Sequence, residues 1–213
     1  MNKSNKIFDV NSKDEHSWNE YVAGLIDGDG CFLISKAGYG SLEITMDIYD
    51  EDALNKLKQK LGGSVLPRSG SKSFRYRLHR KAPLIETAHR VNGQIRHTTR
   101  LLQFKRICDL YNIPFKEPLP LTSNNGWFSG FFDADGTIGF SLKKGWPQLI
   151  VSVSQKNKID LLPFQSVFGG YIRLDKASDT HKWELYSEKA ILEFHKYLKE
   201  YPLYSHKKSV FLY

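Results

Sequence analysis

Along the first half of the chain, the spacing of hydrophobic and polar residues changes from segment to segment between the period of a helix and the alternation of a β-strand. Residues 18–27 carry an apolar run with helical spacing, and residues 31–48 alternate apolar and polar side chains around a glycine-containing turn, as a β-hairpin requires. An amphipathic helix over 50–63, a hairpin over 64–79 and a closing helix over 83–91 follow. The pattern predicts one αββαββα unit.

The same order returns in the second half. The corresponding segments are a helix over 126–133, a hairpin over 137–155, a helix over 157–170, a hairpin over 171–186 and a helix over 189–201. Three landmarks support a repeat: Asp29 and Asp135 precede a Gly-Gly pair by 33 and 34 residues, and each pair precedes a strand leucine, Leu78 or Leu185, by 15. We therefore predict a tandem duplication and an α+β fold.

Glycine, proline and aspartate suggest where the elements end. Gly30 and Gly136 are expected to supply C-caps for the leading helices, and Asp50 is expected to cap the helix over 50–63. A further helical stretch over 100–113 runs into "PFKEPLPLTSNN", whose three prolines indicate a surface linker. The predicted organisation is a loosely held N-terminal arm (1–15), a first half-domain (16–112), a linker (113–125) and a second half-domain (126–213).

Composition favours a globular protein with a polyanionic partner. Hydrophobic residues make up 40% of the 213 positions, enough for a core, and 31 Lys and Arg against 23 Asp and Glu give a net charge of +8. The basic residues are dispersed, which favours nucleic acid over a membrane surface. No apolar run approaches the roughly 18 residues of a membrane span, and the first residues lack a signal peptide, so we expect no secretion. Cys31 and Cys108 match no metal spacing and are expected as buried thiols in a reducing compartment.

Period-2 alternation assigns each strand residue to one face of its sheet. The face expected under the helices carries Phe32, Ile34, Leu42, Ile44, Met46, Val65, Tyr76 and Leu78, then Ile138, Phe140, Leu142, Val151, Val153, Ile172, Trp183 and Leu185. The opposite face carries Ser35, Ser41, Glu43, Thr45, Arg68, Arg75 and Arg77, then Ser141, Lys143, Gln148, Ser152, Ser154, Tyr171, Arg173, Lys182 and Glu184. Any antiparallel sheet with one solvated face looks similar. Two such faces in a basic protein favour recognition of bases in the major groove of DNA. There Arg hydrogen-bonds to guanine, Gln to adenine and Glu to cytosine.

Each leading helix ends in two aspartates, Asp27 and Asp29 in the first unit and Asp133 and Asp135 in the second. Members of one pair lie about 200° apart around the helix, so they cannot bind one ion together. A carboxylate at the negative end of a helix dipole is unfavourable unless a cation compensates it. We therefore expect one ligand from each helix.

Small residues precede these acids, Ala23 and Gly24 in the first helix and Ser129 and Gly130 in the second. Such residues allow two helix backbones to approach closely. If the two helices pack side by side, their last aspartates converge on one point.

The stretches "VAGLIDGDG" (22–30) and "FSGFFDADG" (128–136) resemble the paired LAGLIDADG motifs of intron-encoded homing endonucleases of the single-chain, two-motif type. The resemblance extends from about Trp18 to the end of the sequence. An EF-hand calcium loop is the alternative interpretation of "DGDG" and "DADG". Such a loop requires glycine at its sixth position, but counting from Asp27 and Asp133 this position is Phe32 and Ile138. The EF-hand interpretation is therefore excluded.

The resemblance implies two units related by pseudo-two-fold symmetry, whose antiparallel sheets form a saddle over double-stranded DNA. Asp29 and Asp135, helped by the carbonyls of Gly28 and Ala134, would bind Mg²⁺, with Mn²⁺ as a substitute and Ca²⁺ binding without cleavage. Two-metal hydrolysis of each strand would leave short 3′ overhangs. The implied enzyme is a monomer.

Two further roles come from the same resemblance. Lys207, in "YPLYSHKKS", matches a catalytic lysine, while the first-unit stretch "NGQIRHTTR" has none and offers Arg96, Thr98 or Arg100 instead. The polar water-positioning residue of the family falls on Gln155.

The first-unit counterpart of Gln155 by spacing is Ile48, so the site is expected to be asymmetric. His97 and His206 occupy matching places and are expected as packed or surface residues, not bases. Asp27 and Asp133 are expected to anchor the helix ends or the interface.

Three functions are compatible with the resemblance: a site-specific DNA endonuclease, an RNA-binding maturase that assists a group I intron with or without cleavage, and a DNA-binding regulator that has lost cleavage. Maturases can lose the last aspartates, and both survive here, which favours the endonuclease. The family's usual origin implies a mitochondrion or chloroplast.

Overall fold

The computed structural model describes residues 3–143 and 145–211, with side chains over 14–142 and 145–209. The first half contains α1 (Lys3–Asp29), β1 (Gly30–Ile34), β2 (Gly40–Asp47), η1 (Ile48–Asp50), α2 (Glu51–Leu61), β3 (Ser64–Pro67), β4 (Ser73–Leu78), α3 (Lys81–Val91) and α4 (Thr98–Tyr111). The second contains α5 (Trp127–Asp135), β5 (Gly136–Lys143), β6 (Trp146–Gln155), η2 (Lys158–Asp160), α6 (Leu162–Phe168), β7 (Tyr171–Asp175), β8 (Thr180–Leu185), α7 (Glu188–Glu200) and α8 (Lys207–Phe211). The predicted α+β class and repeated αββαββα order are confirmed.

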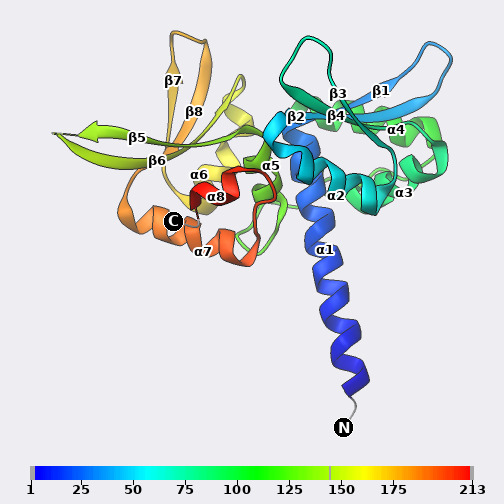
Figure 1. Cartoon of the computed structure of the whole chain (residues 1–213), viewed down its shortest axis with the longest axis horizontal. Helices are drawn as coiled ribbons and strands as arrows, with labels where there is room; N and C mark the ends of the chain where they lie inside the picture. Colours follow the sequence, from blue (N-terminus) through cyan, green and yellow to red (C-terminus); the bar gives the residue numbers. More distant parts are fainter. Residues whose placement is uncertain (1–2, 144, 212–213) are drawn as a thin grey trace.

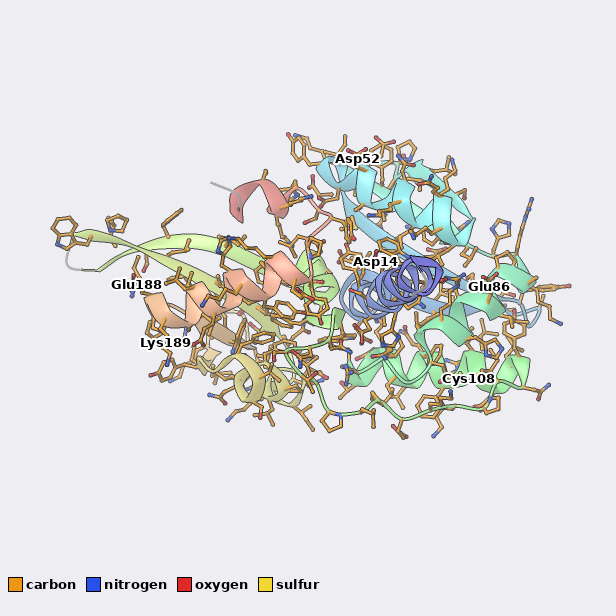
Figure 2. All side chains as sticks on the ribbon, turned by 90° about the horizontal axis from the view of Figure 1, so that it is seen from below. Asp14, Asp52, Glu86, Cys108, Glu188 and Lys189 are labelled. Carbon is orange, nitrogen blue, oxygen red and sulfur yellow. The ribbon has the colours of Figure 1, made fainter. Side chains whose placement is uncertain are left out.

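Each unit has one four-stranded antiparallel sheet, in the order β1-β2-β4-β3 or β5-β6-β8-β7. The sheets lie side by side along the longest axis, and α1 rises from far below to the junction between them (Figure 1). Seen from below, helices cover the molecule and α1 is viewed end-on (Figure 2). Within the described chain, no helix combines the length and apolar character needed to cross a bilayer.

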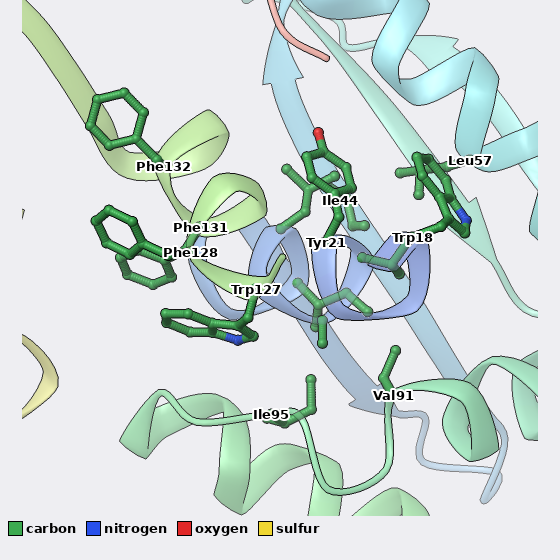
Figure 3. Close-up of a cluster of buried hydrophobic side chains, with 14 of the residues drawn as sticks. Trp18, Tyr21, Ile44, Leu57, Val91, Ile95, Trp127, Phe128, Phe131 and Phe132 are labelled. Atoms are coloured by element: carbon green, nitrogen blue, oxygen red, sulfur yellow. The ribbon is translucent and has the colours of Figure 1, made fainter. Parts of the chain in front are cut away.

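The helix pair α1 and α5 forms the centre of the molecule. Figure 3 shows Phe128, Phe131 and Phe132 on one side of the pair and Trp18 and Tyr21 on the other, all of them buried. Phe128 packs edge-on against Trp183 of β8, and Trp18 and Tyr21 pack against Tyr204, so aromatic rings on both sides hold the helix pair in the core.

Glycines set the distance between these two helices. A Cβ added to Gly24 would lie 1.8 Å from the carbonyl oxygen of Trp127, and one added to Gly130 would lie 1.9 Å from that of Tyr21. Both neighbours, Ala23 and Ser129, are buried. The small residues thus lie where the helix backbones come closest.

The structure adds detail to three local predictions. Residues 3–15, within the stretch expected as a loosely held arm, are helical and continue α1. Gly136 is the C-cap of α5, as expected, and its backbone N–H donates to the carbonyl oxygen of Phe132, but its conformation is extended, with φ −73°, and an added Cβ would lie 2.3 Å from the Phe132 ring. Gly30, like Gly136, begins a strand directly after its helix. Here glycine provides space where each helix passes directly into a strand. Asp50 makes no capping hydrogen bond, because its carboxylate binds His206 instead.

Two expectations of burial also differ from the structure. Phe140 and Leu142 are 74% and 78% exposed, because the β5–β6 hairpin extends beyond the helices that cover the rest of its sheet (Figure 1). Ser152, expected on the solvated face, is buried, since central strand β6 places it between Thr137 and Glu184. The side chain of Lys143 lies outside the described residues.

Candidate active site

The last turns of α1 and α5 touch. A Cβ on Gly28 would lie 2.3 Å from the Cβ of Ala134 and 3.5 Å from Oδ2 of Asp135. Asp29 and Asp135 therefore end their helices beside one another, as the small residues upstream suggested.

The two carboxyl groups share a low-dielectric environment. Burial raises the pKa of Asp29 to about 7, and the charge of Asp135 is the next largest cause. Burial also raises the pKa of Asp135, opposed by a 2.6 Å hydrogen bond from Gln155 Nε2 and by the charge of Lys207. Two half-buried carboxyl groups with raised pKa values, one of them raised further by the charge of the other, form an electrostatic environment that a divalent cation would stabilise.

Oxygen is the donor that these residues offer. The carboxylates of Asp29 and Asp135 and the carbonyls of Gly28 and Ala134 are hard ligands of the kind that Mg²⁺ prefers, with water and phosphate completing the set. In the described part of the chain, no group of three or more His, Cys, Asp or Glu side chains could hold a metal. The residues thus fit an ion shared with substrate oxygens, and they do not fit an all-protein cage.

Lys207 neutralises the carboxyl end of α5. Its Nζ donates to the carbonyl oxygens of Phe132, Asp133 and Ala134 at 3.2, 2.6 and 3.0 Å. Burial lowers the pKa of Lys207, while neighbouring aspartates, Asp133 foremost, oppose that change. An ammonium group therefore sits where the helix dipole is negative and beside both terminal acids.

Arg100 takes the corresponding place in the first unit. Its guanidinium donates to the carbonyl of Gly28 at 3.3 Å. The other two candidates bind elsewhere: Arg96 donates to the carbonyl of Leu119 and Thr98 donates to Asp160. The structure thus identifies Arg100 as the counterpart of Lys207, a choice among three residues that the sequence alone left open.

Asp27 and Asp133 anchor the two units to each other. Asp27 accepts from Trp127 Nε1 at 2.8 Å and from the backbone of Arg96 at 2.7 Å. Asp133 accepts from the hydroxyl of Tyr21 at 2.8 Å and from the backbone of Tyr204 at 2.6 Å. In each case the aromatic donor comes from the leading helix of the other unit.

A second pair of aspartates fixes the loops beside the site, and the sequence analysis missed it. Asp160 accepts from the backbone and the hydroxyl of Thr98 at 2.9 and 3.0 Å. Asp50 accepts from the backbone and the Nδ1 of His206 at 2.7 and 2.9 Å. Both acids lie in 3₁₀ turns, but at different distances from the Gly-Gly landmarks, so comparison by spacing could not pair them.

The surroundings of Asp29 and Asp135 differ. Asp135 accepts a hydrogen bond from Gln155, whose own Oε1 lies 3.2 Å from Nε2 of His97. Within the described residues, the carboxylate of Asp29 receives no hydrogen bond, and Ile48, the counterpart of Gln155, is 45% exposed.

Charged clusters occupy the solvated face of each sheet. Glu43 contacts Arg77 at 2.6 Å and Arg75 at 3.3 Å. Glu184 contacts Arg173 at 2.9 Å and Lys182 at 3.6 Å. The other predicted reading residues with described side chains, apart from Ser152, are exposed or half-buried: Ser35, Ser41, Thr45, Arg68, Ser141, Gln148, Ser154 and Tyr171.

Four aspartates with raised pKa values make the stability of the metal-free protein depend on pH. Burial raises the pKa of Asp27 and Asp29 to about 7 and raises that of Asp133 and Asp135. Such groups hold protons more tightly in the folded chain, so their contribution is complete below the unfolded pKa near 3.8 and is lost as pH rises through about 7. We expect Tm in EDTA to fall as the pH is raised from about 5.5 to about 8.5.

Asp29→Asn is the matched variant for this titration. In this variant Tm should decrease less as the pH is raised. At pH 8 its Tm should be higher by roughly 2 to 4 °C for each kcal/mol of repulsion between residues 29 and 135 that the substitution removes. A Tm that rises with pH across this range contradicts the assignment.

Comparison with known proteins matches the sequence model of a family described as LAGLIDADG endonuclease to residues 22–111 and 128–213. A protein from Debaryomyces hansenii named probable intron-encoded endonuclease aI2 is 43% identical over 88% of this chain, which covers 31% of that protein. The intron-encoded RNA maturase bI4 of Saccharomyces cerevisiae is 44% identical over 100% of this chain and 35% of its own length. The chain thus spans about a third of these two relatives.

A shorter relative is covered more fully. The intron-encoded DNA endonuclease ai2a of Dictyostelium discoideum is 38% identical over 97% of this chain and 68% of its own length. Among solved structures, the meganuclease I-SmaMI bound to uncleavable DNA has a TM-score of 0.71 and 20% identity, covering 91% of this chain and 87% of that one. I-LtrWI bound to target DNA has a TM-score of 0.68 and 16% identity, over 92% and 88%.

Proposed function

Because the chain belongs to the LAGLIDADG endonuclease family, we propose that it is a site-specific endonuclease that cuts both strands of DNA as a monomer. One observation carries the proposal. Asp29 and Asp135 lie on the touching ends of two helices, beneath the junction of two sheets with basic solvated faces; burial raises the pKa of both, and the charge of Asp135 raises that of Asp29 further. A single chain thereby supplies one acid and one reading surface for each half of a target.

The proposed chemistry assigns a role to each group. Asp29 and Asp135, with the carbonyls of Gly28 and Ala134, would hold Mg²⁺ or Mn²⁺, and Ca²⁺ would bind without supporting cleavage. Bound metal supplies an activated water and stabilises the leaving 3′ oxygen. Lys207 and Arg100 place positive charge beside the two acids, and Gln155 orients the carboxylate of Asp135. Cuts on both strands would leave short 3′ overhangs.

Target reading is proposed for the solvated faces of the sheets. Each half-sheet would cover about one turn of major groove, roughly ten base pairs. In the free protein, Glu43 and Glu184 hold basic side chains in defined positions. These carboxylates would therefore determine where the hydrogen-bond donors of the basic side chains lie when DNA binds. Affinity should decrease steeply with salt, because phosphate contacts release counterions.

The test is cleavage selection. The purified protein is incubated with a randomised duplex library and Mg²⁺, with Ca²⁺ as the control, and the cut ends are sequenced. A long specific site with short 3′ overhangs is expected. Binding without cutting in Mg²⁺ and in Mn²⁺ would overturn the proposal.

A maturase is the second candidate, favoured by the 44% identity to a protein named RNA maturase. It would bind group I intron RNA, and an intron splicing assay with and without this protein distinguishes it from the endonuclease. The intron-encoded relatives also support an origin in a mitochondrial or chloroplast genome.

Arg75→Ala and Arg77→Ala test the reading surface. If these residues contact guanine, each variant should weaken specific binding by about 1 to 3 kcal/mol and relax preference at nearby base pairs. The measurement is Kd against single-base variants of the selected target. Lys58→Ala, which removes an exposed charge from α2 on the helical side, is the control. Equal losses for Lys58→Ala and both arginine variants would contradict base reading.

A further inference from the structure

His97, a residue of the first unit, contacts the half of the active site that the second unit supplies. This half-site consists of Asp135 and its hydrogen-bond partner Gln155. His97 is the N-cap of α4, where its Nδ1 accepts a hydrogen bond from the backbone N–H of Thr99 at 3.3 Å. Its Nε2 lies 3.2 Å from Oε1 of Gln155 and 3.4 Å from Oδ2 of Asp160. The ring stacks over Phe131, and its side chain is only 13% exposed. The imidazole is therefore held from several directions.

These contacts determine which ring nitrogen of His97 carries the proton. A backbone N–H can only donate, so Nδ1 must present its lone pair to Thr99. The neutral ring then carries its proton on Nε2, which donates to the carbonyl oxygen of Gln155.

The proton on His97 in turn determines the orientation of the Gln155 amide. With Oε1 accepting from His97, the NH₂ group points the other way, and its Nε2 lies 2.6 Å from Oδ2 of Asp135. The opposite orientation would aim a carbonyl oxygen at a carboxylate and an NH₂ group at an N–H donor. One imidazole tautomer thus ensures that Asp135 receives a donor.

The first half-site lacks this arrangement. Ile48 replaces the glutamine and offers no polar atom. His206, the counterpart of His97, directs its Nδ1 to Asp50 at 2.9 Å, and its side chain is 45% exposed. The same residue type in the matching loop therefore has no amide to orient.

We propose that His97 is a positioning residue for the second half-site: its Nε2–H orients Gln155 so that the amide donates to Asp135, which makes one of the two strand cuts depend on a histidine of the opposite unit. The inference rests on the proposed endonuclease function. It also predicts that the two strands respond unequally to the same substitution.

The key variant is His97→Asn. Asparagine is a good N-cap, so it preserves the hydrogen bond to Thr99, but it is too short to reach Gln155. His206→Asn is the matched control, because that loop has no glutamine partner. Rates are measured on a duplex of the selected target with each strand end-labelled separately. The strand cut in the second half-site is identified as the one slowed by Gln155→Leu.

We expect His97→Asn to slow that strand by about 10- to 100-fold, the usual effect of losing a group that orients a ligand, and to leave the other strand within about twofold. The double variant His97→Asn/Gln155→Leu should be no slower than Gln155→Leu alone. His206→Asn should not reproduce the strand bias. Equal slowing of both strands by His97→Asn, no slowing, or additive effects in the double variant would overturn the proposal.

A second readout does not require cleavage. In metal-free protein labelled with ¹⁵N, the imidazole spectrum of His97 should show the Nε2–H tautomer, and the side-chain NH₂ of Gln155 should exchange slowly with solvent. His97→Asn should make that exchange fast, while Asp52→Asn should not. An Nδ1–H tautomer, or slow exchange in both variants, would refute the positioning role. If the wild-type protein cuts no DNA, the proposed function fails and these spectra still decide whether His97 orients Gln155.

Discussion

Replacing Asp29 or Asp135 with asparagine should abolish double-strand cleavage, with rates at least about 10³-fold lower, while target affinity stays within a few fold. The amide keeps the shape of the side chain but loses the charge that holds a divalent cation, and that cation supplies several kcal/mol of charge stabilisation in hydrolysis. Affinity should persist because both carboxyl groups lie at the helix ends and not on the basic faces of the sheets. Cleavage is measured on the selected target in Mg²⁺, and affinity on the same target in Ca²⁺.

Asp52→Asn is the control for these substitutions. It removes the same charge from an exposed position of α2, so it should cut DNA at the parental rate. Cleavage by Asp29→Asn or Asp135→Asn at more than a few per cent of the parental rate would refute the metal assignment. A loss of affinity as large as the loss of cleavage would show that the acids act in binding.

Replacing Gly24 or Gly130 with alanine should strongly destabilise the folded chain. The added Cβ would lie 1.8 Å from the backbone oxygen of Trp127 or 1.9 Å from that of Tyr21, and backbone atoms in the centre of a helix pair cannot move aside as a flexible side chain can. The helices must separate, which uncovers buried aromatic rings and displaces both terminal acids. We expect a loss of about 3 kcal/mol or more, measured by urea unfolding, with cleavage lost as well.

Gly139→Ala provides the comparison. Gly139 lies in β5, and a Cβ added there meets nothing within 4 Å, so alanine should be tolerated. A Gly24→Ala variant with the stability of Gly139→Ala would mean that the helices do not pack as closely as the structure describes.

Much of the architecture could be predicted from the sequence, because it depends on local periodicity and on a repeat. Alternation predicted the two hairpins of each unit, and the order of elements is confirmed. The helix ends were less predictable. Gly136 caps α5 as expected, but only the packed structure reveals that the Phe132 ring leaves no room there for a side chain.

The site was predictable where small residues in both motifs indicate that two helices pack closely, and unpredictable where the contacts join loops that carry no such pattern. The convergence of Asp29 and Asp135 followed from the small residues in their helices. The contacts of Asp50 with His206 and of Asp160 with Thr98 join residues of different units, so no local pattern indicates them. The exposure of Phe140 and Leu142 was missed because alternation assigns a face without showing whether a helix covers it.

The exchanged hydrogen bonds between the units have a consequence for how this chain can change over generations. Trp127 bonds Asp27, and Tyr21 bonds Asp133, so each half carries a donor that only the other half uses. Joining one half to the corresponding half of a relative should therefore keep these two bonds only if the relative carries the matching partner in each. Substitutions in the helices that join the units are thus more constrained than substitutions on the solvated faces of the sheets.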